Sequence, residues 1–214
     1  MTQEDISAAF EGLPHNQAAE NNKEPIFNGW VKLGLNQQKV FEIGSGTGQQ
    51  GVYFCSKLPE LQWKPSEVSA NLEVLNLWYD AARRSGIDNF QPPVLFNIET
   101  GNFPESDTIY TSNVLHIVSN DLAKQLVQRV STQLSLGHQF VCYGPYKVDG
   151  KFTTESNREF DLWLKAQGYG GLLDVSQIEK WSGQSLTLRH KVDMPANNFL
   201  LLFEKTSIFD KTLP

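Results

Sequence analysis

Near the start of this chain an apolar strand pattern runs directly into a glycine-rich turn, and few folds accommodate that sequence. Residues 39–43 are Lys-Val-Phe-Glu-Ile, and residues 44–48 are Gly-Ser-Gly-Thr-Gly. A helical pattern follows over 47–58. Glycines let the backbone turn tightly and let a ligand approach closely, while the helix start offers unpaired N–H groups and the positive end of its dipole. The pattern therefore indicates an α/β sheet that holds a nucleotide-like ligand beyond its first strand.

The spacing of the glycines separates two kinds of ligand. Dinucleotide sites favour G-x-G-x-x-G, with the pyrophosphate at the helix N-terminus. Here Gly44, Gly46 and Gly48 form G-x-G-x-G, with Ser45 between the first two and Glu42 two positions before them. This arrangement resembles motif I of the class I methyltransferases that depend on S-adenosylmethionine (SAM), where the glycines give access to the amino-acid and ribose parts. The alternative is a glycine-rich turn that binds no ligand.

Strand and helix patterns alternate from residue 39 onward. We expect strands near 39–43, 61–66, 93–98, 107–112, 138–143, 185–192 and 198–205, with helices near 47–58, 70–85, 120–134, 155–167 and 176–183. Alternation favours a mostly parallel sheet covered by helices on both faces. Only residues 193–197 separate the last two strands, which predicts an antiparallel hairpin. The expected fold is thus α/β, a Rossmann-like three-layer sandwich of the class I methyltransferase type, with a mostly parallel seven-stranded sheet and a C-terminal antiparallel hairpin.

The 214 residues suit one domain with a sizeable core. We expect a single methyltransferase-like domain over 1–214, in which the polar N-terminal segment 1–35 covers the cofactor site. A helix is predicted to begin near 21–26 with Pro25 in its first turn, because proline is well tolerated there.

Composition argues against several classes of partner. The net charge is −6 and the basic residues are scattered, so a nucleic-acid partner is not expected. The two cysteines and four histidines have no metal-ligand spacing, so no metal is expected. We find no signal peptide and no apolar run of about 18 residues, which predicts a cytoplasmic protein without a membrane association. A small-molecule substrate fits these features, and the sequence does not indicate an oligomeric state.

Polar side chains follow the second, third and fourth strands, where an open α/β sheet binds ligands. Glu67 can accept hydrogen bonds from both ribose hydroxyls, although a solvated strand end would explain it equally simply. Asn97 can pair with the amino group and a ring nitrogen of adenine. Asn113 is expected at the methionine end of the cofactor.

Four further residues are candidates for the acceptor side of the site. His116 is expected near the transferred methyl, either as a general base or as a buried structural histidine. Tyr143 is a second candidate base, and Tyr146 and Asn157 are expected to line one substrate pocket with them. Ordinary turn geometry at 144–145 is the alternative. Asn197 and Asn198 form part of a hairpin turn and are candidates to brace the pocket from its edge.

Together these segments resemble one family. The chain looks like the DUF938 family, whose animal members are called methyltransferase-like protein 26, in the segments 22–26, 42–49, 63–67, 113–117, 143–146, 156–157 with 160–161, and 194–198, the last reading Met-Pro-Ala-Asn-Asn. The resemblance covers about 15–205. It implies a class I methyltransferase fold and SAM binding, with Asn22 and Ser45 in the cofactor site. This chain departs from the family pattern at four positions, Lys23, Gln50, Glu67 and Asn97.

Three functional hypotheses follow. The first is a SAM-dependent methyltransferase that acts on a small molecule, in which the protein supplies alignment and a shielded site. The second is a non-catalytic protein that binds SAM or S-adenosylhomocysteine (SAH) and acts through partners. The third is an NAD-type oxidoreductase, which the glycine spacing and the terminal hairpin disfavour.

Overall fold

The computed structural model of the chain describes residues 9–207. The chain divides into two compact units, one up to Ser106 and the other from Asp107. The expectation of one domain over 1–214 stays a prediction.

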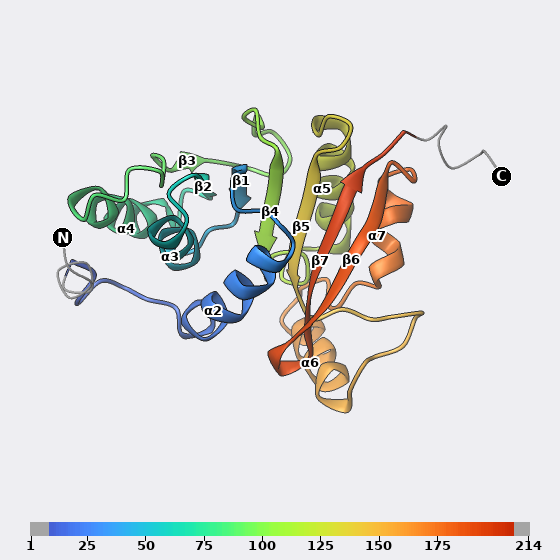
Figure 1. The fold of residues 1–214 in the computed structure, drawn as a ribbon. Coiled ribbons are helices and arrows are strands. Elements are labelled where there is room, and N and C mark those ends of the chain that lie inside the picture. Colours follow the sequence, from blue (N-terminus) through green and yellow to red (C-terminus); the bar gives the residue numbers. More distant parts are fainter. Residues whose placement is uncertain (1–8, 208–214) are drawn as a thin grey trace. The chain divides into compact units, whose positions relative to one another are not determined.

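The first unit contains three parallel strands with helices between them (Figure 1). Along the chain it comprises α2 (Gln17–Lys32), β1 (Lys39–Ile43), α3 (Gln49–Lys57), β2 (Gln62–Glu67), α4 (Leu72–Arg84) and β3 (Val94–Leu95). Strand β2 lies between β1 and β3. Fully buried aromatic rings fill the space between α2, α3 and β2, with Trp30, Phe54 and Trp63 between 5.4 and 5.7 Å apart.

Helix α2 begins earlier than its sequence predicts. Asn16 caps it by accepting the N–H of Ala19 at 3.1 Å, so Pro25 lies inside the helix and the prediction of a first-turn proline is wrong. The polar residues before Pro25 are helical because the helix packs Ile26 and Trp30 into the core on one face. Tertiary packing thus outweighs the proline's cost to the helix.

Strand β3 is much shorter than the predicted 93–98. The prolines at 92 and 93 precede it, and neither can donate a ladder hydrogen bond. Just beyond it, Oδ1 of Asn97 accepts the N–H of Glu99 at 2.7 Å, which turns the chain away from the sheet.

The second unit contains two parallel strands and an antiparallel hairpin. Along the chain it comprises β4 (Thr108–Ser112), α5 (Asn120–Gln133), β5 (Gln139–Gly144), α6 (Glu155–Ala166), α7 (Val175–Trp181), β6 (Leu186–Met194), the short helix η1 (Pro195–Asn197) and β7 (Asn198–Lys205). The strand order is β4-β5-β7-β6, with β7 antiparallel to both of its neighbours. Helix α6 lies beside the turn between β6 and β7 (Figure 1).

The strand pattern predicted from the sequence is confirmed. All seven expected strands are present. The pairs β1–β2, β2–β3 and β4–β5 are parallel, and the C-terminal hairpin of β6 and β7 is antiparallel. The buried face of α5 carries Ala123, Leu126, Val127 and Val130, in agreement with its helical period.

Candidate functional site

The turn after β1 adopts a backbone that requires its glycines. Gly44, Gly46 and Gly48 have φ values of 73, 58 and 90°, a region that L-residues avoid. A Cβ built on Gly46 would have no described atom within 4 Å, so this part of the turn borders open space. A Cβ on Gly48 would instead lie 2.7 Å from Leu75, so that glycine is needed for packing against α4.

The start of the turn is fixed to the end of β2. The N–H groups of Gly44 and Ser45 both donate to the carbonyl of Ser66, at 3.1 and 2.9 Å. In return, Oγ of Ser45 accepts the N–H of Ser66 at 3.0 Å. The side chain of Ser45, predicted to bind cofactor, therefore holds the turn itself in place.

Glu67 closes β2 beside the same turn. Its Oε1 accepts the N–H of Gly46 at 3.1 Å, and its Oε2 accepts the N–H of Val68 at 2.7 Å and the amide of Asn71 at 3.3 Å. The residue is only 8 % exposed. A carboxylate oxygen has two lone pairs, so Oε1 retains acceptor capacity after binding Gly46. The carboxylate shapes the turn and remains able to accept a further hydrogen bond.

Glu42 lies behind the turn rather than on it. Its carboxylate is 2 % exposed and accepts the indole N–H of Trp63 at 2.8 Å. Burial raises the pKa of Glu42 from an ordinary 4.5 to about 7, although the Trp63 and Ser45 hydrogen bonds oppose the shift. The structure thus assigns Glu42 a supporting contact, and its predicted contact with a cofactor stays a prediction.

Gln49, which the sequence interpretation missed, joins the turn to the N-terminal segment. Its buried side chain accepts the hydroxyl of Thr47 at 2.7 Å and the N–H of Asn16 at 2.6 Å, and it donates to Glu20 at 2.9 Å. A glutamine in the first turn of a helix gives no sequence signal for this role. Asn22 is half-buried on α2, and whether the segment 1–35 covers a cofactor stays a prediction.

The side-chain oxygen of Asn97 binds the backbone of the residues that follow it. Oδ1 accepts the N–H groups of Glu99 and Thr100, at 2.7 and 3.3 Å, while the side chain itself is exposed. Its Nδ2 keeps its donor capacity, whereas the predicted two-point pairing with adenine would have to displace the Oδ1 contacts.

In the second unit, the ends of β4 and β5 bring three of the predicted residues together. Asn113 adopts φ 58°, which asparagine tolerates better than most residues, and its N–H donates to the carbonyl of Tyr143 at 2.9 Å. A Cβ on Gly144 would lie 3.3 Å from Nδ1 of His116 and 3.6 Å from Oδ1 of Asn113. The polar side chains of His116 and Asn113 thus both lie close to Gly144, at the end of β5.

His116 is 6 % exposed and is held in a neutral form. Burial lowers its pKa from 6.5 to about 4. Its ring meets that of Phe160 edge-on at 5.8 Å, and within residues 9–207 no group hydrogen-bonds to the imidazole. At neutral pH one ring nitrogen is therefore an acceptor without a partner in the described chain.

The loop before α7 fixes the position of His116 through its backbone. The N–H of Gly171 donates to the carbonyl of His116 at 3.2 Å, and the next N–H, of Leu172, donates to Asp161 at 2.7 Å. Asp161 is 2 % exposed, and its carboxylate also accepts a hydrogen bond from the ammonium of Lys165 at 2.7 Å. Asp161 thus links α6 to the segment that carries His116, a role that no sequence pattern identified.

The hairpin turn braces two predicted site residues. Nδ2 of Asn198 donates to the hydroxyl of Tyr143 at 3.0 Å, and Nδ2 of Asn157 donates to the carbonyl of Asn197 at 3.1 Å. These bonds hold Tyr143 and Asn157 in place, and the predicted role of the two asparagines at the edge of a substrate pocket stays a prediction. Burial raises the pKa of Tyr143 to about 12, so at neutral pH its hydroxyl stays protonated and serves as a hydrogen-bond donor.

Tyr146 lies apart from this group. It is buried, and its hydroxyl interacts with the thiol of Cys142, with its pKa raised mainly by burial. The side chains of Cys142 and Tyr143 point to opposite faces of β5, because successive strand residues alternate. The contact with Cys142 thus places the hydroxyl of Tyr146 on the other face of β5 from that of Tyr143, and the predicted common pocket stays a prediction.

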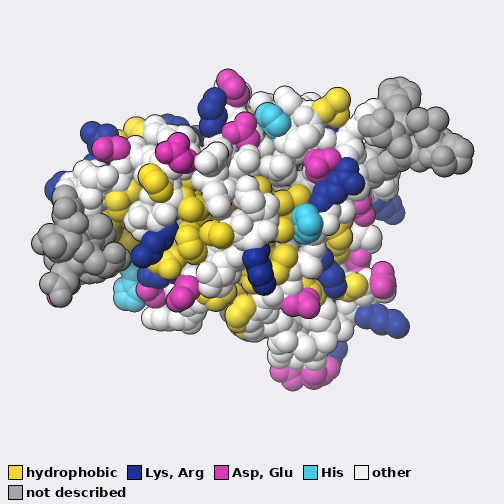
Figure 2. Space-filling model, in the orientation of Figure 1, with side chains coloured by type: hydrophobic (Ala, Val, Ile, Leu, Met, Phe, Trp, Pro, Cys, Tyr) yellow, Lys and Arg dark blue, Asp and Glu magenta, His cyan; other side chains and the backbone are white. Residues whose placement is uncertain are grey.

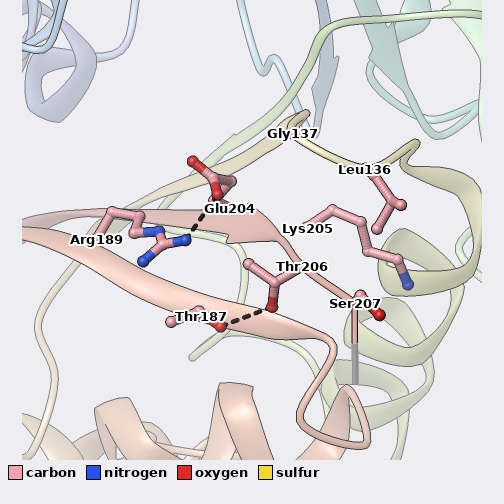
Figure 3. Close-up of a pocket in the computed structure, with 8 residues that line it drawn as sticks. All are labelled: Leu136, Gly137, Thr187, Arg189, Glu204, Lys205, Thr206 and Ser207. Carbon is pink, nitrogen blue, oxygen red and sulfur yellow. Dashed lines mark hydrogen bonds and ion pairs between the residues drawn. The ribbon is translucent and has the colours of Figure 1, made fainter. Parts of the chain in front are cut away.

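A shallow cavity of about 310 Å³ lies at the other end of the hairpin (Figure 3). Its polar groups already pair with one another, Arg189 with Glu204 at 2.8 Å and Thr187 with Thr206 at 2.8 Å. None of the predicted site residues lines it.

The surface and the helices add three observations. On the face drawn in Figure 2, Lys and Arg side chains occur as separate groups interspersed with acidic ones. Among residues 9–207, no cluster of His, Cys, Asp and Glu is arranged to hold a metal ion. Over the same residues, no helix has both the length and the apolar character needed to cross a membrane.

Comparison with known proteins gives one family and one fold. The family model described as "Protein of unknown function (DUF938)" matches residues 13–205. Among solved structures, human N-acetylserotonin methyltransferase in complex with SAM is 12% identical, with a TM-score of 0.74 over 95% of this chain and 56% of its own. The O-methyltransferase family 2 protein from Planctomyces limnophilus, in complex with apigenin, is 18% identical, with a TM-score of 0.69 over 79% and 51% of the two chains.

A third similar structure, PigF with SAH, is 18% identical, with a TM-score of 0.68 over 85% of this chain and 55% of its own. The chain therefore spans about half the length of the solved structures that it matches. At these identities the likeness establishes the fold, and the predicted class I methyltransferase fold is confirmed.

Proposed function

We propose that this chain, which belongs to the DUF938 family, is a SAM-dependent methyltransferase that acts on a small molecule. One observation carries the proposal: Glu67 accepts a hydrogen bond from Gly46, so a carboxylate lies against a glycine turn that borders open space. The solved structures that contain SAM or SAH on the same fold support the choice of cofactor. In this proposal residues 1–214 form one functional domain.

The residues of the first unit fit such a cofactor. A ribose offers two hydroxyl donors, and the Glu67 carboxylate is a partly buried acceptor at a strand end. The turn at Gly46 has no Cβ and no described atom within 4 Å of the place where one would stand, so a bulky ligand can approach the backbone. The Glu67 carboxylate would repel a negatively charged phosphate, so the site suits a ligand without a phosphate better than one that carries it.

The residues of the second unit fit the acceptor side of the reaction. When bound, SAM supplies a methyl group that is activated for displacement by its positively charged sulfur. His116 is neutral above about pH 4 and accepts a hydrogen bond from the acceptor's hydroxyl or amine. The protonated hydroxyl of Tyr143, held by Asn198, donates a hydrogen bond that orients the acceptor. These contacts contribute alignment more than proton abstraction, because a histidine with so low a pKa is a weak base.

A methyl-transfer assay tests the proposal. The purified chain is incubated with SAM carrying a labelled methyl group and a fractionated pool of small metabolites, and label is sought in the products. We expect label in at least one fraction, and a loss of this label in the folded Glu67→Ala variant. Binding of SAM without transfer to any fraction would instead support the non-catalytic hypothesis.

A further inference from the structure

Helix α6 presents large aromatic side chains on its outer face. Phe160 is 36% exposed and Trp163 is 54% exposed, and their rings lie 5.8 Å apart with an angle of only 10° between their planes. The inner face of the same helix is occupied by Asn157, Asp161 and Leu164, which are all buried. The aromatic pair therefore does not serve the core of the unit, and a contiguous exposed apolar surface is a feature that binding sites share.

The pair continues to the unpaired ring of His116. Phe160 pairs with both Trp163 and His116, with 5.8 Å between ring centres in each case; its plane is nearly parallel to that of Trp163 and steeply inclined to that of His116. Ile117, which follows His116 in sequence, is also exposed, at 44%. Thus an apolar platform ends at a polar side chain that is more than nine-tenths buried and has no hydrogen-bond partner within residues 9–207.

The charges of α6 narrow the chemistry of the ligand. Its two basic side chains are each paired with an acid, Arg158 with Glu155 and Lys165 with Asp161. The helix therefore has no unpaired cation with which to recognise a phosphate or carboxylate. Parallel flat rings favour a flat ligand, since offset stacking is the preferred geometry of aromatic groups.

We propose that Phe160 and Trp163 form a stacking platform for a planar, uncharged aromatic methyl acceptor whose hydroxyl or amine donates a hydrogen bond to His116. The inference rests on the proposed function, because it names the acceptor class for the same reaction. The imidazole suits this role at neutral pH, since burial keeps it unprotonated. The aromatic body of the acceptor covers the platform, and its donor pairs with the imidazole nitrogen that has no partner in the described chain.

Three bicyclic probes separate the parts of this proposal. 2-Naphthol is flat and carries a donor, 2-methoxynaphthalene is flat without a donor, and decahydro-2-naphthol carries the donor on a ring system that is not flat. Binding is measured by calorimetry on the full chain, saturated with SAH so that no transfer occurs. We expect 2-naphthol to bind more tightly than either of the other two.

Matched variants test the residues. Phe160→Ala and Trp163→Ala are each expected to weaken 2-naphthol binding about 3- to 10-fold, the range of aromatic pair energies. Leu162→Ala is the control, because Leu162 is as exposed as Trp163 on the same helix and should leave binding unchanged. His116→Phe keeps the ring packing but loses the acceptor, so it should abolish the preference for 2-naphthol over 2-methoxynaphthalene.

Several results would overturn the inference. Equal binding of 2-naphthol and decahydro-2-naphthol would exclude stacking, and equal losses in Leu162→Ala and Trp163→Ala would exclude a specific platform. If SAH binds but none of the probes does, the acceptor class is wrong while the proposed function stands. Self-association that Trp163→Ala removes would then assign the platform to contact between copies of the chain. If SAH does not bind to the folded protein, the proposed function fails and the acceptor class with it.

Discussion

The backbone N–H of Gly46 donates a hydrogen bond to Oε1 of Glu67 across 3.1 Å, which joins the middle of the glycine turn to the end of β2. This single contact connects the two parts of the chain that sequence reasoning assigned to the cofactor. In the proposed cofactor site Glu67 would therefore have two tasks, because the carboxylate holds the turn and would also accept hydrogen bonds from the ribose.

Two substitutions of Glu67 separate these tasks. Glu67→Gln keeps an acceptor oxygen for Gly46 but loses the charge, whereas Glu67→Ala loses both. We expect SAH affinity to fall by about 1.5–3 kcal/mol in Glu67→Ala, the size of hydrogen bonds to a charged group, and by less in Glu67→Gln. Calorimetric titration of the folded variants measures this, and unchanged affinity in Glu67→Ala would remove the ribose assignment.

Gly46→Val is expected to prevent cofactor binding. The valine Cβ would enter the open space beside the turn, and a β-branched residue also strains a backbone with φ 58°. Gly34→Val is the matched control, since Gly34 has φ 74° and no described atom within 4 Å of its Cβ position either. Both variants should lose on the order of 1–2 kcal/mol of folding free energy, and only Gly46→Val should lose SAH affinity. Similar SAH binding by the two variants would contradict the account of the turn.

Gly171→Ala tests the link between α6 and His116. A Cβ at Gly171 would lie 2.5 Å from Oδ1 of Asp161, whereas one at Gly168 would meet no described atom within 4 Å. Both glycines have positive φ, so Gly168→Ala reports the backbone strain alone. We expect Gly171→Ala to destabilise the chain by about 1–3 kcal/mol more than Gly168→Ala, the usual cost of overpacking. Urea unfolding measures the difference, and equal stabilities would show that Asp161 is free to move.

The stability of the chain should depend on pH through two buried groups that act in opposite directions. Between pH 4.5 and 7 the folded state keeps a proton on Glu42 that the unfolded state has released, so the free energy of unfolding falls as pH rises. Between pH 4 and 6.5 the unfolded state binds a proton at His116 that the folded state does not, so the same free energy rises with pH. Each contribution is on the order of 3 kcal/mol, so they largely cancel.

Single substitutions should reveal each contribution. Glu42→Gln removes the contribution of Glu42 and keeps that of His116, so the free energy of unfolding should increase from pH 4 to 6.5. His116→Asn removes the contribution of His116 and keeps that of Glu42, so the free energy of unfolding should decrease from pH 4.5 to 7. Urea unfolding across this range measures both slopes. Variants whose pH profiles run parallel to that of the wild type would show that these groups do not titrate as described.

The sequence was sufficient to predict features that depend on local patterns. Strand periodicity located β1, β5 and β7, and the short spacing at 193–197 required a hairpin. The glycine spacing located the turn after β1, because glycine adopts the positive φ found at Gly46 more readily than any other residue type.

Side-chain directions could not be predicted, because they depend on partners distant in sequence. Glu42 turns toward Trp63, which is 21 residues away. Gln49 hydrogen-bonds to Asn16 and Glu20, which lie at the start of a helix that begins earlier in the sequence than expected. In each case a polar group found its partner through tertiary packing, which no spacing rule encodes.

The central claim, that the glycine turn and Glu67 form a SAM-type cofactor site, is tested most directly by calorimetric titration of the wild-type chain with SAH and with NAD. We predict saturable heat with SAH and none with NAD at the same concentrations. No binding of SAH to protein shown to be folded, or tighter binding of NAD than of SAH, would contradict the account.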